Sequence, residues 1–285
     1  MSSPSLRGLI TLLRLPYWLM TGGLSLLTAF AIAPRMLTVE TVLLVFFSMA
    51  LITSAGFSIN DYYDKESDAI IKPKRPIPSG SLSLRQVVAV SIALFLVGLG
   101  LALIISWLCF VILAGDSLLL LAYSMIIKRK SGFAANILVG LLVGTAFIYG
   151  EAALPVPMKL VSLTLYPICF GTVGGNILRD ILSVEGDAKV GYPTLPQKIG
   201  NNNSVRVAAF FFMLTAVLSP LPTVFGFFGI QYLVLILLWG ILLFYSSVRL
   251  ISSVPTVENV RKYERLITMS MILLPLSLIV EGVLL

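Results

Sequence analysis

Residues 41–68 read TVLLVFFSMALITSAGFSINDYYDKESD, an apolar run that ends in a dense group of acidic residues. The apolar part, residues 41–59, approaches the roughly 20 residues that a helix needs to cross a bilayer. The whole chain shares this character, because 58% of its 285 residues are hydrophobic and only 12% are charged. One soluble globule of this size cannot bury so much apolar surface, and a disordered chain would be far more polar. The sequence therefore predicts a polytopic membrane protein.

Apolar runs of spanning length predict an all-α fold, a bundle of nine transmembrane helices in a single intramembrane domain, residues 1–285. We expect the spans near residues 8–32, 41–59, 86–107, 109–127, 133–153, 158–177, 204–224, 229–250 and 265–285. The third and fourth runs are almost continuous, so we place a tight turn between them around Trp107–Ala114.

The distribution of basic residues predicts the orientation. With the N-terminus in the cytoplasm, every Lys and Arg except Arg35 and Lys159 falls on the cytoplasmic side, as the positive-inside rule requires. We therefore expect a multi-pass protein of the cell membrane, N-in and C-out. The net charge of +7 follows from this asymmetry. Because the basic residues are spread over several loops, we expect no nucleic-acid binding.

Histidine is absent from the chain, which excludes a Ser-His triad, a His-ligated zinc ion and a His proton shuttle. The two cysteines, Cys109 and Cys169, both lie in apolar runs. We expect them to be buried as small hydrophobic residues, with neither a disulfide framework nor a cysteine metal cluster.

The acids of residues 60–68 follow helical spacing. Asn60, Asp64 and Asp68 are four residues apart and share one helix face, and Asp61 flanks that face. Like charges at this spacing repel one another, so a cation should compensate them.

A second acidic stretch, residues 176–187, follows the sixth predicted span. Here Asn176, Asp180, Ser183 and Asp187 recur on one helix face. Both stretches continue the cytoplasmic ends of spans, which predicts that both face the cytoplasm. Solvated helix ends would explain either stretch alone, but two matched stretches favour a pair of Mg²⁺ half-sites bridged by a diphosphate.

Cations accompany the first acidic stretch. Residues 72–78 read KPKRPIP, and their prolines predict a stiff, extended loop that could fold back over the acids with Lys72, Lys74 and Arg75. Arg14 lies within the first predicted span, and Lys128–Lys130 end the fourth. Snorkelling and topogenic roles would explain these residues, but carboxylates, metal and cations together are the usual clamp for a phosphate.

These two motifs resemble those of UbiA-type intramembrane prenyltransferases. The first is residues 60–68 followed by KPKRPIPSG at 72–80, and the second is Asp180–Asp187 followed by GYPTLP at 191–196. The resemblance covers essentially the whole chain. It implies a nine-helix bundle whose active site opens to the cytoplasm and to lipid, motif loops near residues 60–85 and 176–200, and Mg²⁺-dependent transfer of a polyprenyl group from its diphosphate to an acceptor.

The resemblance also implies roles for individual residues. The ligands of the first metal ion would be Asn60, Asp64 and Asp68, and those of the second Asp180 and Asp187. We add two candidate oxygen ligands, Asp61 and Asn176, of which Asn176 could be a spectator. The diphosphate contacts would be Arg14, Lys72 and Lys128, with Arg75 of the same loop as a further candidate. The catalytic groups would be Asp64, Asp180, Lys128 and Tyr123. Relatives often carry an acid where Asn176 and Ser183 stand, which places more weight on Asp180 and Asp187.

The acceptor is open at this point. The compact length and the KPKRPIPSG loop resemble archaeal ether-lipid synthases, which favours geranylgeranylglyceryl phosphate. The alternative is an aromatic acceptor, 4-hydroxybenzoate or a related quinone or chlorophyll precursor. A remote alternative is an ion-coupled transporter that uses the acids as a cation site.

The remaining acids carry no role in this interpretation. Glu40 and Glu151 lie at the outer ends of spans, where we expect them to be solvated. Asp116 and Glu281 lie in apolar surroundings, and Glu185 is unassigned.

Overall fold

The computed structural model describes residues 5–284, and every regular element in that range is a helix. Eight helices are long and apolar enough to cross a membrane. A ninth span results if α1 (Leu6–Leu13) and α2 (Pro16–Ile32), which meet at a 43° bend, count as one. The predicted all-helical, multi-span fold is confirmed, while the N-in orientation stays a prediction.

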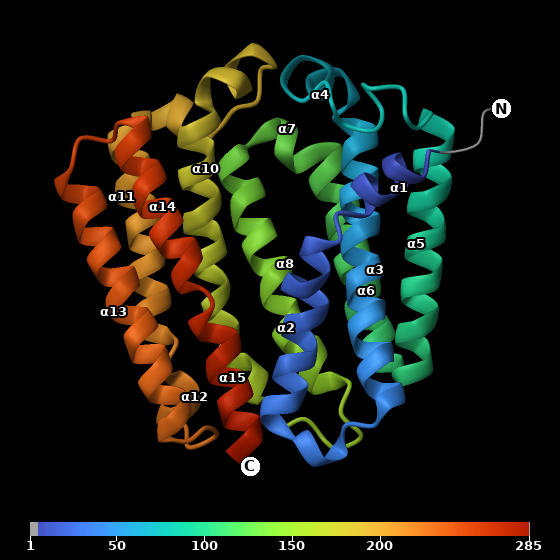
Figure 1. Cartoon of the computed structure of the whole chain (residues 1–285), viewed down its shortest axis with the longest axis vertical. Coiled ribbons are helices and arrows are strands. Elements are labelled where there is room, and N and C mark those ends of the chain that lie inside the picture. The colour runs from blue at the N-terminus through green and yellow to red at the C-terminus, as the bar shows by residue number, and fades with distance from the viewer. Residues whose placement is uncertain (1–4, 285) are drawn as a thin grey trace. The chain divides into compact units, whose positions relative to one another are not determined.

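The chain forms two compact units. Among the described residues, unit 1 comprises residues 5–26 and 38–129, and unit 2 comprises residues 27–37 and 130–284. Besides α1 and the first part of α2, unit 1 holds α3 (Val39–Tyr63), α4 (Lys65–Ile71), α5 (Leu84–Ile105), α6 (Trp107–Ala122) and the π-helical turn η2 (Tyr123–Ile127) (Figure 1). The three-residue helix α7 (Lys128–Lys130) follows directly.

Unit 2 contains the elements from α8 to α15. They are α8 (Gly132–Ala152), α9 (Val161–Leu165), the 3-10 turn η3 (Tyr166–Cys169), α10 (Phe170–Lys189), α11 (Leu195–Leu218), α12 (Leu221–Val224), α13 (Ile230–Ser252), α14 (Val257–Ser270) and α15 (Leu273–Leu284). The turn η1 (Pro34–Met36), after α2, also belongs to this unit.

The turn between the third and fourth predicted spans lies elsewhere than expected. Residues 107–114 are helical, and the chain turns at Ser106 alone, which has extended backbone angles. The Ser106 hydroxyl accepts a hydrogen bond from the Cys109 amide and so caps the first turn of α6. The prediction of a turn at Trp107–Ala114 was wrong, because one serine cap suffices to end α5 and start α6.

Glycines bring neighbouring helices of unit 1 into close contact. A Cβ on Gly22 of α2 would lie 2.5 Å from the Phe46 carbonyl oxygen of α3. A Cβ on Gly98 of α5 would lie 2.9 Å from the Ile52 side chain of α3. Small residues at such crossings are typical of helix packing in membranes. These contacts hold α2 and α5 against α3. The N-terminal part of α3 is apolar, and its C-terminal end carries the first acidic motif.

Unit 2 uses the same device around α10. A Cβ on Gly140 of α8 would lie 2.5 Å from Val173 Cγ2 of α10. A Cβ on Gly174 of α10 would meet the Ala208 carbonyl oxygen of α11 at 2.9 Å. The helix that carries the second acidic motif is thus packed tightly between α8 and α11.

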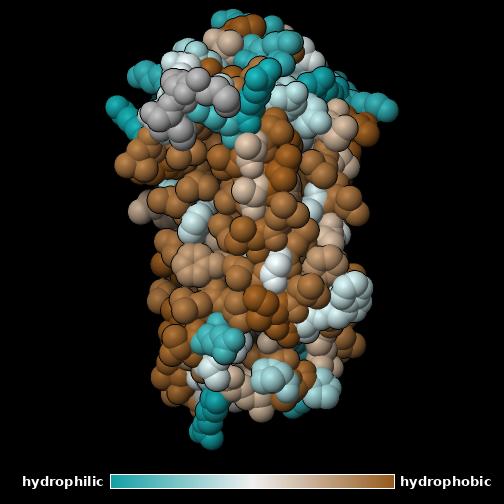
Figure 2. Space-filling view, turned by 90° about the vertical axis from the view of Figure 1, so that its right-hand side faces the viewer, coloured by the Kyte–Doolittle hydropathy of each residue, from teal (hydrophilic) through white to brown (hydrophobic). Residues whose placement is uncertain are grey.

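The side of unit 1 that carries α5 is apolar over most of its length. Figure 2 looks onto this side and shows mainly hydrophobic side chains over its middle, with most hydrophilic ones at the top and a few at the bottom. The exposed apolar residues of α5 include Ile92, Leu96 and Ile104. An exposed apolar surface of this extent fits contact with lipid chains rather than water.

Candidate active site

The first acidic motif lies at the junction of α3 and α4. Asp64 connects the two helices, and the Asp64 amide still donates to the Asn60 carbonyl (2.9 Å), as the Asp68 amide does to the Asp64 carbonyl (2.7 Å). The four-residue step therefore continues across the junction, and the predicted common face is maintained. All four polar residues are buried, with exposed fractions of 9% for Asn60, 3% for Asp61 and 4% for Asp64 and Asp68.

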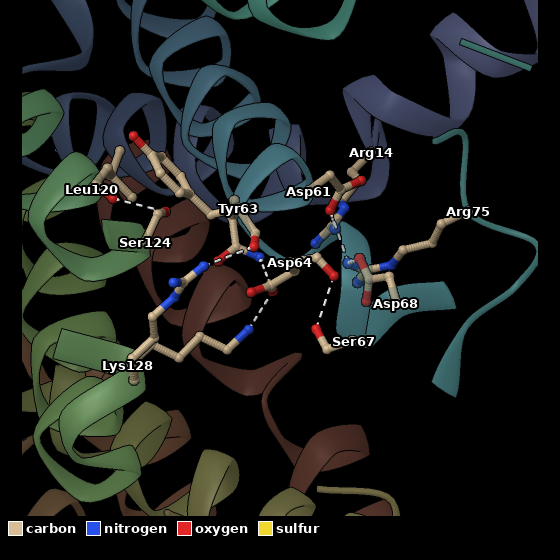
Figure 3. A network of polar contacts seen from close by, with 12 residues as sticks. Arg14, Asp61, Tyr63, Asp64, Ser67, Asp68, Arg75, Leu120, Ser124 and Lys128 are labelled. Carbon is tan, nitrogen blue, oxygen red and sulfur yellow. Dashed lines mark hydrogen bonds and ion pairs between the residues drawn. The ribbon is translucent and has the colours of Figure 1, made fainter. Parts of the chain in front are cut away.

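Two arginines, one distant in sequence and one in the following loop, pair with Asp61 and Asp68. The Arg14 guanidinium forms an ion pair with Asp61. Arg75 Nη1 lies 2.8 Å from Asp61 Oδ1 and 2.6 Å from Asp68 Oδ2, so one guanidinium bridges both carboxylates (Figure 3). The proline-rich loop thus folds back over the acids, and Arg75 is the residue that makes the contact. The prediction that this loop is extended was wrong, because its residues form consecutive turns closed by backbone hydrogen bonds. Lys74 is exposed.

Lys128 reaches Asp64 through an irregular turn. The Lys128 amide donates to the Tyr123 carbonyl, a five-residue step that inserts one extra residue into the end of the fourth span. Such π-turns re-aim side chains and occur often at functional sites. Here the Lys128 ammonium pairs with Asp64, and the next residue, Arg129, donates to the Tyr63 carbonyl at 3.0 Å (Figure 3). Tyr123 begins this turn and is partly buried.

Lys72 is more accessible than the other predicted phosphate-binding cations. It is exposed and forms no ion pair within residues 5–284. Although the side chain as a whole is exposed, neighbouring atoms partly desolvate its ammonium group, which lowers the pKa of Lys72, and the nearby Arg75 cation lowers the pKa further. Both effects disfavour the charged form of Lys72. A bound anion would offset them, because a nearby negative charge stabilises the ammonium group.

One buried oxygen in this cluster has no hydrogen-bond partner. The Asn60 amide donates from Nδ2 to Asp64 Oδ2 at 2.8 Å, which leaves Asn60 Oδ1 buried and unpartnered. Buried polar atoms are normally satisfied, so an orphaned carbonyl oxygen indicates a missing partner. A carbonyl oxygen beside a carboxylate is the donor set that a hard divalent cation prefers. The residues present therefore fit Mg²⁺.

The set of protein ligands is small. Within residues 5–284, no three His, Cys, Asp or Glu side chains are grouped as a metal site. Mg²⁺ is usually bound by one or two carboxylates, with waters and substrate phosphates completing its octahedron. The chemistry of this cluster suits such an ion better than a metal held by protein side chains alone.

The second acidic motif lies on α10 in unit 2. Asp180 Oδ2 accepts a hydrogen bond from Asn136 Nδ2 of α8 at 2.7 Å, and Ser183 Oγ donates to Asp187 Oδ2 at 2.6 Å. Asn176 Oδ1 accepts from Arg179 Nη1 at 3.2 Å. Asn176, Asp180 and Asp187 are all partly exposed, in contrast to the buried first motif.

Asn136 is a site residue that the sequence analysis missed. It is 9% exposed, and it lies on α8, whereas the acid that it contacts, Asp180, lies on α10. The available signal was an amide in an otherwise apolar predicted span, residues 133–153, because polar groups inside the membrane are costly and often functional.

Glu151 is buried, which contradicts the expectation that it is solvated. It is 2% exposed, and its carboxylate accepts hydrogen bonds from the amides of Lys159, Val161 and Ser162 and from the Ser162 hydroxyl. It caps the start of α9 and closes the α8–α9 loop. The expectation failed because the loop turns back over the carboxylate instead of leaving it in water.

The remaining acids and the two cysteines differ in their burial. Asp116 and Glu281 are buried in α6 and α15, with exposed fractions of 5% and 1%, and Glu281 Oε1 accepts from the Gly229 amide at 3.0 Å. Glu40 and Glu185 are exposed. Cys109 and Cys169 are buried free thiols, as predicted.

The fold and the site define an intramembrane prenyltransferase, and the chain belongs to the UbiA prenyltransferase family, whose model matches residues 21–272. It is similar to a digeranylgeranylglyceryl phosphate synthase of Natronomonas pharaonis, with 37% identity over 81% of this chain and 82% of that protein. The fold is also similar to a solved structure from work on digeranylgeranylglyceryl phosphate synthase in membranes, with a TM-score of 0.84, 30% identity and 99% of each chain covered.

A more distant solved structure shares the fold. It is a UbiA homologue from Archaeoglobus fulgidus bound to GPP and Mg²⁺, with a TM-score of 0.73, 19% identity and coverage of 96% of this chain and 99% of that one. The family model and the similar synthase confirm the predicted family and enzyme class, and the solved structures confirm the predicted fold.

Proposed function

We propose that this enzyme transfers a geranylgeranyl group from its diphosphate to geranylgeranylglyceryl phosphate. The observation that carries the proposal is the buried cluster of Asn60, Asp64 and Lys128, in which an orphaned amide oxygen, a carboxylate and an ammonium group lie together. The relative from Natronomonas pharaonis supports the choice of acceptor, because it matches most of this chain and is a digeranylgeranylglyceryl phosphate synthase.

The first motif would bind the diphosphate and one Mg²⁺. Asn60 Oδ1 and the Asp64 carboxylate would hold the ion, and Asp68 would contribute to it. Lys128, Arg14 and Arg75 would contact the diphosphate oxygens, with Lys72 at the accessible edge. Asp61, which pairs with two arginines, would orient those guanidinium groups as well as supply an oxygen.

The second motif would hold another Mg²⁺ in the same way. Asp180 and Asp187 are its carboxylates, Asn136 orients Asp180, and Ser183 orients Asp187. Asn176 is engaged by Arg179 and would serve as a weaker oxygen ligand. One ion at each motif is part of the proposal, as is a cytoplasmic position for both motifs.

The reaction breaks the allylic C1–O bond of the prenyl diphosphate, and the bonding electrons leave with the diphosphate. Mg²⁺, when bound, neutralises part of that charge. Lys128, Arg14 and Arg75 stabilise the growing negative charge through short, charge-assisted hydrogen bonds. An acceptor hydroxyl oxygen then bonds to C1, and its proton passes to the released diphosphate. In this proposal Tyr123 offers an aromatic face to the cationic carbon.

The apolar helices complete the chemistry. An allylic cation reacts with any water that reaches it, so a reaction site among lipid-facing helices protects it. The same surface would keep the prenyl chains of donor and acceptor within the bilayer. A soluble enzyme would have to bury both chains in a pocket of its own.

The test compares two acceptors side by side. Purified enzyme in detergent or lipid is supplied with Mg²⁺, geranylgeranyl diphosphate and either geranylgeranylglyceryl phosphate or 4-hydroxybenzoate, and both diphosphate release and product are measured. We expect product with the glyceryl phosphate. Product with 4-hydroxybenzoate alone would assign the enzyme to aromatic acceptors. No product with either, together with wild-type behaviour of Asp64→Ala and Asp180→Ala, would overturn the enzyme assignment.

A further inference from the structure

The junction of α1 and α2 is held by a small hydrogen-bonded cluster of Leu13, Trp18 and Ser54, called the knot below. The helix must break here, because Pro16 lacks an amide hydrogen and disfavours a helical residue before it. Arg14 sits at the break in the left-handed conformation (φ 50°, ψ 52°), which is unusual for a residue other than glycine. The break leaves the Leu13 carbonyl, the last of α1, without a helical partner.

Two side chains satisfy that carbonyl. The Ser54 hydroxyl of α3 donates to the Leu13 oxygen at 2.7 Å, and the Trp18 indole of α2 donates to the same oxygen at 3.2 Å. The indole also lies 2.6 Å from Ser54 Oγ, so the three groups contact one another. In a membrane an unsatisfied carbonyl is costly, and the knot removes that cost. Ser54 is fully buried.

The knot holds Leu13, the residue before Arg14, and Arg14 in turn pairs with Asp61. Ser54, Phe57 and Asp61 are three and four residues apart, so they form one stripe along α3. Ser54 holds the backbone of Leu13, the Phe57 ring lies 4.4 Å from the Arg14 guanidinium, and Asp61 pairs with that guanidinium. One helix face therefore controls the backbone, the side chain and the charge of the Arg14 region.

We propose that Trp18 and Ser54 are positioning residues for Arg14. By holding the Leu13 carbonyl, they keep Arg14 in its left-handed conformation and aim its guanidinium at the Asp61 end of the first motif. This inference rests on the proposed role of Arg14 as a diphosphate contact. Neither residue touches the substrate in this mechanism; both act through Arg14.

The test measures binding of magnesium geranylgeranyl diphosphate by calorimetry, together with kcat and the KM of each substrate. Ser54→Ala and Trp18→Phe each remove a donor to the Leu13 carbonyl, and Trp18→Phe keeps a ring for the edge contact with Phe47. We expect each to weaken binding about tenfold, the size expected for one lost buried hydrogen bond. The KM of the glyceryl phosphate acceptor should not change.

Thr53→Val is the matched control. The Thr53 hydroxyl also links α3 to α2, through Thr21 at 2.8 Å, but does not contact Leu13. If the knot acts only by holding the two helices together, Thr53→Val will weaken binding as much as Ser54→Ala does. If it positions Arg14, Thr53→Val will bind like wild type.

A double-mutant cycle separates positioning from general stability. In an Arg14→Ala background, Ser54→Ala should weaken binding no further, because its target is gone. Full additivity of the two changes, or wild-type binding by Ser54→Ala and Trp18→Phe, would overturn the inference. Failure of the proposed acceptor is a separate result, since wild-type enzyme that binds the diphosphate but prenylates no glyceryl phosphate leaves the binding comparison intact.

Discussion

The Asn136 amide of α8 donates to the Asp180 carboxylate of α10 at 2.7 Å. This contact joins a partly exposed acid of the second motif to a buried amide on the neighbouring helix. A carboxylate held in this way has a restricted orientation, and it presents its remaining lone pairs in a defined direction. Residues that orient metal ligands commonly affect metal affinity nearly as much as the ligands do.

Asn136→Ala should therefore raise the Mg²⁺ concentration needed for half-maximal activity by about tenfold or more. The physical reason is the loss of the donor that fixes Asp180. The measurement is a Mg²⁺ titration of initial rate at saturating substrates, and Asn202→Ala, at an exposed position of α11, serves as the control. An unchanged Mg²⁺ requirement in Asn136→Ala would separate this contact from metal binding.

Asn60 provides a test of the orphaned oxygen. Asn60→Leu removes both amide atoms, whereas Asn60→Asp keeps an oxygen in the same place. We expect Asn60→Leu to weaken Mn²⁺ binding about tenfold or more, measured by the paramagnetic signal of the free ion, and Asn60→Asp to retain it. Chelation of the metal should abolish transfer in wild-type enzyme, and added Mg²⁺ should restore it. Equal Mn²⁺ binding by both variants would show that Asn60 Oδ1 is no ligand.

Lys128 should be needed for the chemical step. Lys128→Met keeps the length of the side chain but removes the charge that pairs with Asp64. In the proposed mechanism that charge stabilises the leaving diphosphate. A decrease in kcat of about 100-fold or more is expected, as for other preorganised groups that stabilise developing charge. Lys130→Met is the control, since Lys130 is an exposed cation two residues further along the chain. Similar losses in both variants would point to topology rather than catalysis.

Glu151 should matter for stability and not for chemistry. Glu151→Ala leaves three backbone amides and the Ser162 hydroxyl without their acceptor. A loss of about 1–3 kcal/mol or more in the free energy of unfolding is expected, because buried polar groups would be left unsatisfied. Thermal unfolding followed by circular dichroism would show a lowered Tm for Glu151→Ala and a smaller change for Glu151→Gln. Unchanged melting of Glu151→Ala would contradict the capping role.

Local patterns in the sequence were sufficient for much of the architecture. Apolar run lengths depend on bilayer thickness alone, so they predicted the spans without any knowledge of packing. The four-residue spacing of Asn60, Asp64 and Asp68 predicted their common face, because helical periodicity is local. The turn at Ser106 was predicted a few residues too late in the chain. Its position was ambiguous because apolar residues continue on both sides of it.

The contacts that define the site depend on distant residues. Arg14 and Asp61 are 47 residues apart, and Lys128 and Asp64 are 64 apart. Sequence analysis named these groups but could not pair them, since no local period relates one helix to another. The partnership of Asn136 with Asp180 and the knot of Trp18 and Ser54 were beyond it for the same reason.

The sequence by itself determined the all-helical, multi-span membrane fold and the positions of the acids, because these follow from hydrophobicity and from the pitch of a single helix. Only the tertiary structure decided which cation neutralises which acid, which amide oxygen is left unpartnered and which loop covers Glu151. Those outcomes require helices to approach within hydrogen-bond distance, and that approach is set by small residues such as Gly22 and Gly140, whose effect appears only when a second helix packs against them.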